Sequence, residues 1–347
     1  MNVNRRSLMQ FAGAAAGLGL VGSLAPITAR AATRMTGVTY LPLSYTALSY
    51  GSNGFVDHLK KNAAGVIEPD FFHSGKLLKA GEQLPALRSG NIDFMFHTTS
   101  YITRTLPILG ILGLPGVVEQ LYKNPSRTMI GSPLFNLIND GLAKHDLTML
   151  SVGGGTLEPE YLWAGKGAKL ESTDDIKGKR VRVVGFEATG VVESFGGATV
   201  NVPSSELYLA LQRKTVDAAV ANISTVIGRS LQEQLGSCYR LPLTAHGIGV
   251  FVKKSRWEKL PANVRDGMQA AANWFDAESA KKANADIYPN EFWPKVKAAG
   301  VQVFEPSAAD LAKLEDAGAA VRAAWIKEVG AEVGNQAIAL ALGKASS

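Results

Sequence analysis

Hydrophobic and polar positions in the first third of the chain define alternating strand-like and helix-like segments. Phe55, Leu59 and Ala63 recur at four-residue spacing, which predicts a helix over residues 50–64 that ends at Gly65. Pro69 places one strand at a sheet edge, because proline cannot donate to a neighbouring strand. The expected order is strand 35–42, helix 50–64, strand 66–72, helix 82–89 and strand 92–96. This alternation is typical of a parallel sheet in an α/β domain.

The same alternation returns in the middle of the chain, and the C-terminal third is mostly helical. We expect strands at 179–184, 199–203 and 216–220, and helices at 190–195 and 206–213. Ser204 and Ser205 are candidate N-caps for the second of these helices. Near the C-terminus, Ser307 and Asp310 form a capping pair before a helical run. Two α/β blocks predict two lobes with a crevice between them.

The N-terminus predicts an export signal that ends at residue 31. Arg5 and Arg6 precede an apolar, glycine-rich run from Phe11 to Leu24, and a small-residue cleavage site follows, with Ala31 as its last residue. Together these features resemble a twin-arginine (Tat) signal peptide, read by the Tat export machinery. A transmembrane anchor is the alternative, but the run is shorter than the about 20 apolar residues that a span needs. The predicted location is the periplasm.

Removal of that segment changes the charge of the chain. The net charge of +6 falls to +3, because three arginines and no acidic residue are lost, leaving 33 basic against 30 acidic residues. The remaining Lys and Arg are scattered among acids, so nucleic-acid binding is unsupported. The single cysteine, Cys238, excludes an intrachain disulfide and is expected to be a buried small apolar residue. A GxGxxG pattern at 17–22 lies in the signal and is rejected as a dinucleotide site.

Catalytic patterns are missing from the rest of the sequence. No two histidines have ligand spacing on a helix, and no HExxH, GxSxG or Walker pattern follows residue 31, so we expect neither a metal nor a cofactor. Gly153, Gly154 and Gly155 are interpreted as a flexible crossover between the lobes rather than as an anion site. The four tryptophans Trp257, Trp274, Trp293 and Trp325 are assigned to packing. A binding protein, not an enzyme, is the function these features favour.

One region carries a family resemblance. The chain reads STDDIKGKRVRV at 172–183, GGA at 196–198, PSSELYLALQ at 203–212 and Val216-Asp217. This region resembles the "DLKG-K-RV", "GA-PV" and "EVY-ALQ-G-VDG" patterns of the substrate-binding proteins of tripartite ATP-independent periplasmic (TRAP) transporters, the DctP-like family. Weaker similarity extends to residues 90–94 and 254–261, so it covers most of the chain after the signal.

The resemblance implies a fold and a set of partners. The expected fold is an α/β, two-lobed periplasmic binding protein fold, class II-like, with long C-terminal helices bridging the lobes. Lobe I would comprise residues 32–153, completed by about 247–283, and lobe II residues 154–246, completed by about 284–347. The protein would capture a small organic acid between its lobes and deliver it to the membrane permease subunits of a TRAP transporter.

Seven residues are candidates for ligand binding. The arginine of the family's "K-RV" strand matches Arg182, and a planar guanidinium suits a carboxylate because it offers two parallel donors; a surface arginine is the alternative. The chain departs from the family after Asp217, where Ala218–Asn222 replace Gly-x-Glu, and the missing acid at Val220 weakens the case for a cation. Asn222 supplies either an amide contact or a cap. Strand-end positions add His97, Thr98, Phe186, Glu160 and Trp163, each of which could instead be core.

Three other functions stay open at this stage. The protein could serve an ATP-driven importer, which a neighbouring ATPase gene would support. It could report to a sensor kinase. It could also be a periplasmic enzyme with a dispersed site, which would require turnover of the bound acid.

Overall fold

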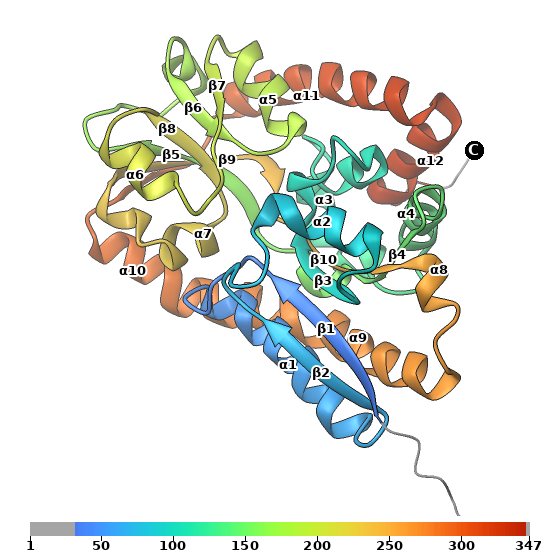
Figure 1. The fold of residues 1–347 in the computed structure, drawn as a ribbon. Coiled ribbons are helices and arrows are strands. Elements are labelled where there is room, and N and C mark those ends of the chain that lie inside the picture. Colours follow the sequence, from blue (N-terminus) through green and yellow to red (C-terminus); the bar gives the residue numbers. More distant parts are fainter. Residues whose placement is uncertain (1–31, 345–347) are drawn as a thin grey trace, which may run out of the picture. The chain divides into compact units, whose positions relative to one another are not determined.

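The structure is a computed structural model that describes residues 32–344, so the predicted export signal lies outside the described residues. Two mixed sheets form its framework (Figure 1). Lobe I is built on a sheet with the order β2 (Ile67–Phe72), β1 (Thr33–Thr39), β3 (Phe94–Thr98), β10 (Ile248–Lys253) and β4 (Leu147–Ser151). Lobe II is built on a sheet with the order β11 (Gln302–Phe304), β9 (Leu235–Ala245), β5 (Pro159–Gly165), β8 (Ala218–Ala221), β6 (Arg180–Val183) and β7 (Ala198–Asn201).

Each sheet combines parallel and antiparallel pairs, and the outer pair β11–β9 of the lobe II sheet is parallel. Strand β1 pairs in parallel with β2 and β3, and β6 pairs in parallel with β7 and β8, as the alternating pattern predicts. Strand β10 runs antiparallel to β3 and β4, and β5 runs antiparallel to β8 and β9. The antiparallel strands are the ones that connect the lobes, because β4 leads into β5 and β9 leads into β10.

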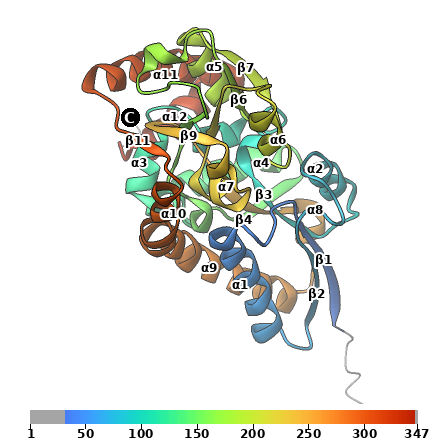
Figure 2. The same cartoon turned by 90° about the vertical axis from the view of Figure 1, so that its left-hand side faces the viewer.

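Helices cover the sheets and join the lobes (Figure 1, Figure 2). The α-helices are α1 (Thr46–Asn62), α2 (Ala80–Ser89), α3 (Val118–Lys123), α4 (Pro133–Ala143), α5 (Phe186–Ser194), α6 (Leu207–Gln212), α7 (Ile223–Gly228), α8 (Lys254–Trp257), α9 (Ala262–Lys282), α10 (Trp293–Ala298), α11 (Ala308–Val329) and α12 (Ala331–Leu342). A π-helical segment, Ala283–Phe292, connects α9 to α10.

The long C-terminal helices bridge the lobes. Helix α9 packs on α1 of lobe I, and the π-helical segment and α10 that follow it pack on α7 of lobe II (Figure 2). Helix α11 packs on α5 of lobe II, and α12 packs on α4 of lobe I. None of the helices within residues 32–344 is long and apolar enough to cross a membrane.

The first crossover between the lobes is tightly packed at its three glycines. Gly153–Gly155 forms a short 3₁₀ turn between β4 and β5. A Cβ at Gly154 would lie 2.0 Å from the Phe275 carbonyl oxygen, and one at Gly155 would lie 2.0 Å from that of Ile248. Only glycine allows the backbone to approach α9 and β10 this closely. The glycines therefore serve close packing at the crossover rather than flexibility.

Two local expectations are wrong. Helix α6 begins at Leu207 after its N-cap residue Glu206, so neither Ser204 nor Ser205 caps it. The Ser204 amide instead donates a hydrogen bond to the Tyr101 hydroxyl of lobe I. The helix expected to start at Gly190 starts at Phe186, because Gly190 lies inside it, where a Cβ would meet Val321 of α11 at 2.7 Å. By contrast, Ser307 caps α11 as expected, accepting a hydrogen bond from the Asp310 amide, and Cys238 is buried.

Candidate functional site

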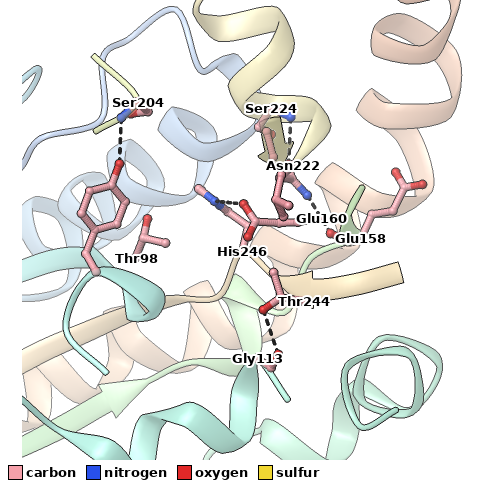
Figure 3. A network of polar contacts seen from close by, with 12 residues as sticks. Thr98, Gly113, Glu158, Glu160, Ser204, Asn222, Ser224, Thr244 and His246 are labelled. Atoms are coloured by element: carbon pink, nitrogen blue, oxygen red, sulfur yellow. Dashed lines mark hydrogen bonds and ion pairs between the residues drawn. The ribbon is translucent and has the colours of Figure 1, made fainter. Parts of the chain in front are cut away.

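Strand ends from both sheets converge at the interface between the lobes. In lobe II, register places Glu160 of β5 opposite Thr244 of β9, and Tyr161 opposite Ala221, so Glu160 lies beside Asn222 although 62 positions separate them in the sequence. Figure 3 shows Glu160, Asn222, Thr244 and His246 gathered in one region with Thr98 of lobe I. Because carboxyl ends of parallel strands meet at one edge of a sheet, this is where an α/β receptor binds its ligand.

Arg182 is held rigidly at this edge. It is 2% exposed, and among residues 32–344 it is the only arginine or lysine that is buried. Its Nε donates to the Val202 carbonyl at 2.8 Å and its Nη1 to the Val220 carbonyl at 2.9 Å. No carboxylate of the described residues forms an ion pair with it. Arg182 therefore presents a buried, oriented and uncompensated positive charge.

Arg180, two positions earlier on the same strand, has the opposite environment. Its side chain is 48% exposed and pairs with Asp217 at 2.8 Å. Residues two positions apart on a strand point to the same face of the sheet. The difference in burial between Arg180 and Arg182 therefore arises from their positions along β6, because Arg182 lies closer to the lobe interface. Arg180 is therefore a surface charge.

The part of lobe I around Tyr40, His97 and Thr98 is uncharged and hydrogen-bonded within itself. The Tyr40 hydroxyl donates to Thr98 Oγ1 at 2.6 Å. The two ring nitrogens of His97 lie 2.9 Å from the Thr98 carbonyl and 3.0 Å from the Ala80 carbonyl. Burial lowers the pKa of His97, and its contacts with the Ala80 and Thr98 carbonyls act in the opposite direction. His97 is thus a packing residue of an aromatic cluster with Tyr40 and Tyr101, with ring centroids 5.2 and 5.9 Å away.

The positive charge of Arg182 affects the Tyr40 hydroxyl of this cluster. Burial raises the pKa of the Tyr40 hydroxyl, and the positive charge of Arg182 acts in the opposite direction. The lobes also touch directly, because the Ser204 amide donates to the Tyr101 hydroxyl at 2.9 Å. Arg229 of lobe II lies over the Tyr45 ring of lobe I at 5.4 Å. The lobes are therefore closed on one another, and a ligand reaches the site when they separate.

Asn222 acts as a helix cap. Its Oδ1 accepts a hydrogen bond from the Ser224 amide at 2.8 Å, at the start of α7, and its Nδ2 donates to the Glu158 carbonyl at 2.6 Å (Figure 3). The side chain is fully buried. Of the two sequence interpretations, the structure places Asn222 as a cap that fixes β8, α7 and the start of β5 relative to one another.

Phe186 and Trp163 lie in packed positions. The Phe186 ring approaches Gly110, where a Cβ would lie 3.0 Å from it. Trp163 is fully buried, donates to the Ala221 carbonyl at 2.8 Å and stacks on Trp293 with ring centroids 5.7 Å apart. Of the predicted residues, Glu160, Asn222 and Thr98 lie in one region of the interface (Figure 3), and Arg182 lies close enough to Tyr40 for its charge to act on the Tyr40 hydroxyl.

Three residues that the sequence did not suggest as ligand-binding candidates place unsatisfied polar atoms at or next to this interface. Ser204 Oγ, His246 Nε2 and both carboxyl oxygens of Glu187 are buried without a hydrogen-bond partner among the described residues. His246 Nδ1 lies 3.5 Å from Glu160 Oε1, so the Nδ1 edge of the imidazole is directed to a carboxylate. Buried polar atoms are ordinarily paired, so unpaired ones at one interface indicate a place where another molecule supplies partners.

Glu187 is buried where α5 meets lobe I. It is 1% exposed, and Thr103 of lobe I lies beside its carboxyl without a hydrogen bond of normal geometry. Burial raises the pKa of Glu187 to about 8, with the negative charge of Glu160 adding to the effect. Its carboxyl is therefore mostly protonated at neutral pH. The interface thus holds two arginines, the buried Arg182 and the partly buried Arg229, together with Glu187 and the Glu160–His246 pair.

The cavities described next are not lined by Arg182, Glu187, Glu160 or His246. Four cavities of about 420 to 530 Å³ are lined by other parts of the described chain, and one of them reaches Tyr101 from the side of α2. Within residues 32–344, no group of three His, Cys, Asp or Glu side chains is arranged to hold a metal ion.

Two α/β lobes, crossed by paired strands and long helices and closed on a buried polar interface, define the class of two-lobed periplasmic binding proteins. Residues 44–328 match the family model described as bacterial extracellular solute-binding protein, family 7 (DctP). The chain belongs to this family, which comprises the solute-binding proteins of TRAP transporters. It is therefore an extracytoplasmic solute receptor of the periplasm and not an enzyme, as the sequence predicted.

Relatives and solved structures agree with the family. A solute-binding protein of Albidiferax ferrireducens is 26% identical over 297 residues, covering 80% of each chain. The C4-dicarboxylate-binding protein DctB of Bacillus subtilis is 25% identical over 280 residues, covering 75% of this chain and 77% of its own.

Similar folds are found in TRAP solute-binding proteins of known structure. A marine metagenome protein specific for pyroglutamate has a TM-score of 0.76 at 22% identity, covering 90% of this chain and 99% of its own. A protein from Rhodoferax ferrireducens with bound malonate has a TM-score of 0.74 at 21% identity, covering 90% and 97%. These similarities confirm the predicted two-lobed fold with bridging C-terminal helices.

Proposed function

We propose that this receptor captures a small organic carboxylate between its lobes, with Arg182 as the carboxylate anchor, and delivers it to the membrane permease subunits of a TRAP transporter. The observation that carries the proposal is the uncompensated charge of Arg182. A buried charge without a partner is costly, and a ligand carboxylate would supply the missing partner.

The geometry of Arg182 supports a carboxylate in particular. Two of its nitrogens are held by backbone carbonyls, so the plane of the guanidinium is fixed before the ligand arrives. A fixed planar group suits the planar carboxylate, and pre-ordering reduces the entropy lost on binding. Solved proteins of similar fold hold pyroglutamate, malonate and succinate, all of which are carboxylates.

The remaining predicted residues take supporting roles in this proposal. Glu160 and Thr98 face the ligand from lobe II and lobe I, and Asn222 positions the strand ends on which Arg182 and Glu160 depend. His97, Phe186 and Trp163 would act through packing. No residue of the described chain is assigned to a cofactor.

We also infer the boundaries of the lobes. The sequence predicts lobe I as residues 32–153 and about 247–283, and lobe II as residues 154–246 and about 284–347. The switch of β10 into the sheet of lobe I supports the boundary near residue 247. Because α12 packs on α4, we assign it to lobe I.

Export through the Tat machinery belongs to the same proposal. The paired arginines Arg5 and Arg6, followed by a glycine-rich apolar run, support it. Replacing both with lysine in the full chain should leave the protein in the cytoplasmic fraction. Unchanged recovery in the periplasm would show that another route exports it.

The binding test is titration of organic acids into Arg182→Ala, followed by calorimetry. Losing one partner of a buried charge pair costs about 2–5 kcal/mol, so affinity should fall at least about thirtyfold. Arg180→Ala is the matched control, because it removes an exposed arginine from the same strand and should bind as the parent does. If Arg182→Ala binds as tightly as the parent, the assignment of the anchor is wrong. Circular dichroism of both variants separates loss of binding from loss of fold.

A further inference from the structure

We propose that Arg229 of lobe II and Tyr45 of lobe I form a latch, the contact of residues 228–229 with residues 44–45, that holds the lobes together over the bound ligand and sets the rate at which the ligand leaves. The inference rests on the proposed function, because the latch closes the same site. It concerns the release of the ligand and not the choice of ligand.

The two lobes make three contacts where the end of α7 meets the start of α1. The guanidinium carbon of Arg229 lies 5.4 Å from the centre of the Tyr45 ring, within the range of a cation–π interaction. A Cβ on Gly228 would lie 2.4 Å from Tyr45 Cδ2, so a side chain at this position would displace the ring. At the solvent-exposed edge of the junction, the Ser44 hydroxyl donates to the Gly228 carbonyl at 2.8 Å. All three contacts join one lobe to the other.

Arg229 has no carboxylate partner within residues 32–344. The arginines that form ion pairs in this part of the chain do not include it, and its Nε is buried without a hydrogen-bond partner there. The face of a tyrosine ring carries negative partial charge and attracts a cation. The Tyr45 ring is therefore the partner of the Arg229 charge, and it belongs to the opposite lobe.

Arg240 has a similar aromatic contact, but within one lobe. Its guanidinium carbon lies 5.1 Å from the centre of the Tyr161 ring and 4.9 Å from that of Trp293, and it also pairs with two carboxylates. These partners belong to lobe II, so separation of the lobes leaves the environment of Arg240 intact. Arg229 instead loses its aromatic partner when the lobes separate.

Tyr45 contacts lobe II through its ring and not through its hydroxyl. The residue is fully buried, and its hydroxyl has no hydrogen-bond partner among the described residues. Gly228 and Arg229 approach the ring itself. Tyr45 directly precedes α1, which begins at Thr46, so the ring is fixed to lobe I by this helix. Replacing Tyr45 with phenylalanine should therefore preserve the latch.

Helix α7 separates the latch from the ligand anchor. Asn222 caps its first turn, next to the strand end where Arg182 donates to the backbone, and Arg229 follows its last residue. The six residues of α7 span roughly 9 Å. Arg229 is therefore a positioning residue that acts through Tyr45 and lobe closure. Its loss should leave the preference among ligands unchanged.

A contact that exists only in the closed form slows the release of the ligand. The ligand leaves when the lobes separate, and separation breaks the contacts between them. Removing an arginine from an aromatic ring should therefore raise the dissociation rate at least about threefold. The association rate should change by less than about twofold, because the ligand enters the open form, in which the latch is absent.

The test is stopped-flow measurement of the association and release of L-pyroglutamate, D-glucuronate, malonate and succinate, followed by tryptophan fluorescence. Arg229→Ala should release each bound acid at least about threefold faster than the parent and keep the rank order of the acids. Arg213→Ala is the matched control, because Arg213 follows the six-residue helix α6 as Arg229 follows α7, but its side chain is exposed. This control should release each acid as the parent does.

Conservative variants test whether the ring and the cation form the latch. Arg229→Lys keeps a cation and Tyr45→Phe keeps the ring, so both should release the acids within about twofold of the parent. Tyr45→Leu removes the aromatic face, and combining it with Arg229→Ala should add little to the effect of either change alone. If Tyr45→Phe speeds release as much as Tyr45→Leu does, the hydroxyl is the group that matters and the latch is contradicted.

The outcomes separate the latch from the proposed function. If Arg229→Ala releases every acid as slowly as Arg213→Ala while binding depends on Arg182, the anchor is right and the latch is wrong. A changed rank order of the acids in Arg229→Ala would mean that Arg229 contacts the ligand, which also overturns the latch. If binding of every acid is independent of Arg182, or no acid binds, the proposed function is contradicted, together with the latch that rests on it.

Discussion

The two lobes meet at one interface but contribute different chemistry to it. On the lobe I side, Tyr40 donates to Thr98 and His97 faces backbone carbonyls, and the buried Tyr45 hydroxyl is the uncharged group that lacks a partner among the described residues. On the lobe II side, Arg182 has no counter-charge among residues 32–344, and Glu187 and Ser204 have atoms without partners in the same part of the chain. The comparison indicates that lobe II and the adjoining crossover select the ligand, while lobe I closes over it with an uncharged surface.

The largest expected effect is on the pH dependence of stability, through Glu187 of lobe II. Burial raises the pKa of Glu187 from 4.5 to about 8. A raised pKa in the folded state means that its contribution is fully present below pH 4.5 and is lost as the pH rises toward 8. Within that window the parent should lose about 1.4 kcal/mol of unfolding free energy per pH unit relative to Glu187→Gln. Urea unfolding at several pH values measures this difference.

His97 of lobe I provides the control for that experiment. Its pKa is lowered by burial, so the folded protein loses stability relative to the unfolded chain as the pH falls below 6.5. This acid limb should persist in Glu187→Gln. Parallel curves for the parent and Glu187→Gln between pH 5 and 8 would show that Glu187 ionises normally in the folded protein.

The next largest effect is the loss of ligand affinity when the planar guanidinium of Arg182 in lobe II is replaced by an ammonium group. Arg182→Lys keeps the positive charge but cannot donate to Val202, Val220 and a ligand in one plane. We expect the affinity for the preferred acid to fall about tenfold to thirtyfold, roughly 1.4–2 kcal/mol. Calorimetry measures this loss, and affinity equal to the parent would show that charge alone suffices.

A smaller effect is expected where the lobes touch. Tyr101→Phe removes the hydroxyl that accepts from the Ser204 amide, which should destabilise the closed form by about 1 kcal/mol and weaken binding about fivefold. Tyr208→Phe is the control, since the Tyr208 hydroxyl donates to Glu233 within lobe II. Equal losses in the two variants would contradict a role for this contact in closure.

The smallest effect is expected where the polar groups of lobe I hydrogen-bond to one another. The double replacement Tyr40→Phe and Thr98→Val removes both partners of one hydrogen bond, a change that is often nearly neutral. We expect binding within about threefold of the parent. A loss as large as that of Arg182→Lys would show that lobe I reads the ligand directly and would remove the contrast between the lobes.

The parts of the fold that the sequence predicts are those with local signals. The parallel strands β1 to β3 and β6 to β8 follow from alternating apolar runs, and α11 follows from its capping pair and spacing. The antiparallel strands β5, β9 and β10 lack such a signal, because their place depends on pairing with strands far away in the chain. Arg182 was found because it belongs to a family pattern.

The rest of the site depends on tertiary contacts. Nothing local distinguishes Glu187 from a surface acid on a helix, and its burial arises only when α5 packs on lobe I. His246 lies in a short turn whose importance comes from the register of β9 with β5. Conversely, the sequence allows Trp163 to face either the crevice or the core. In the structure its side chain packs in the core against Trp293.

The most direct test of the central claim is a thermodynamic cycle between Arg182 and the carboxylate of the ligand. The affinities of L-pyroglutamate and of its carboxamide would be measured for the parent and for Arg182→Ala. If Arg182 binds the carboxylate, the parent should prefer the acid by at least about thirtyfold, and the variant should bind the acid and the amide nearly equally. An equal preference for the acid in both proteins would contradict the account.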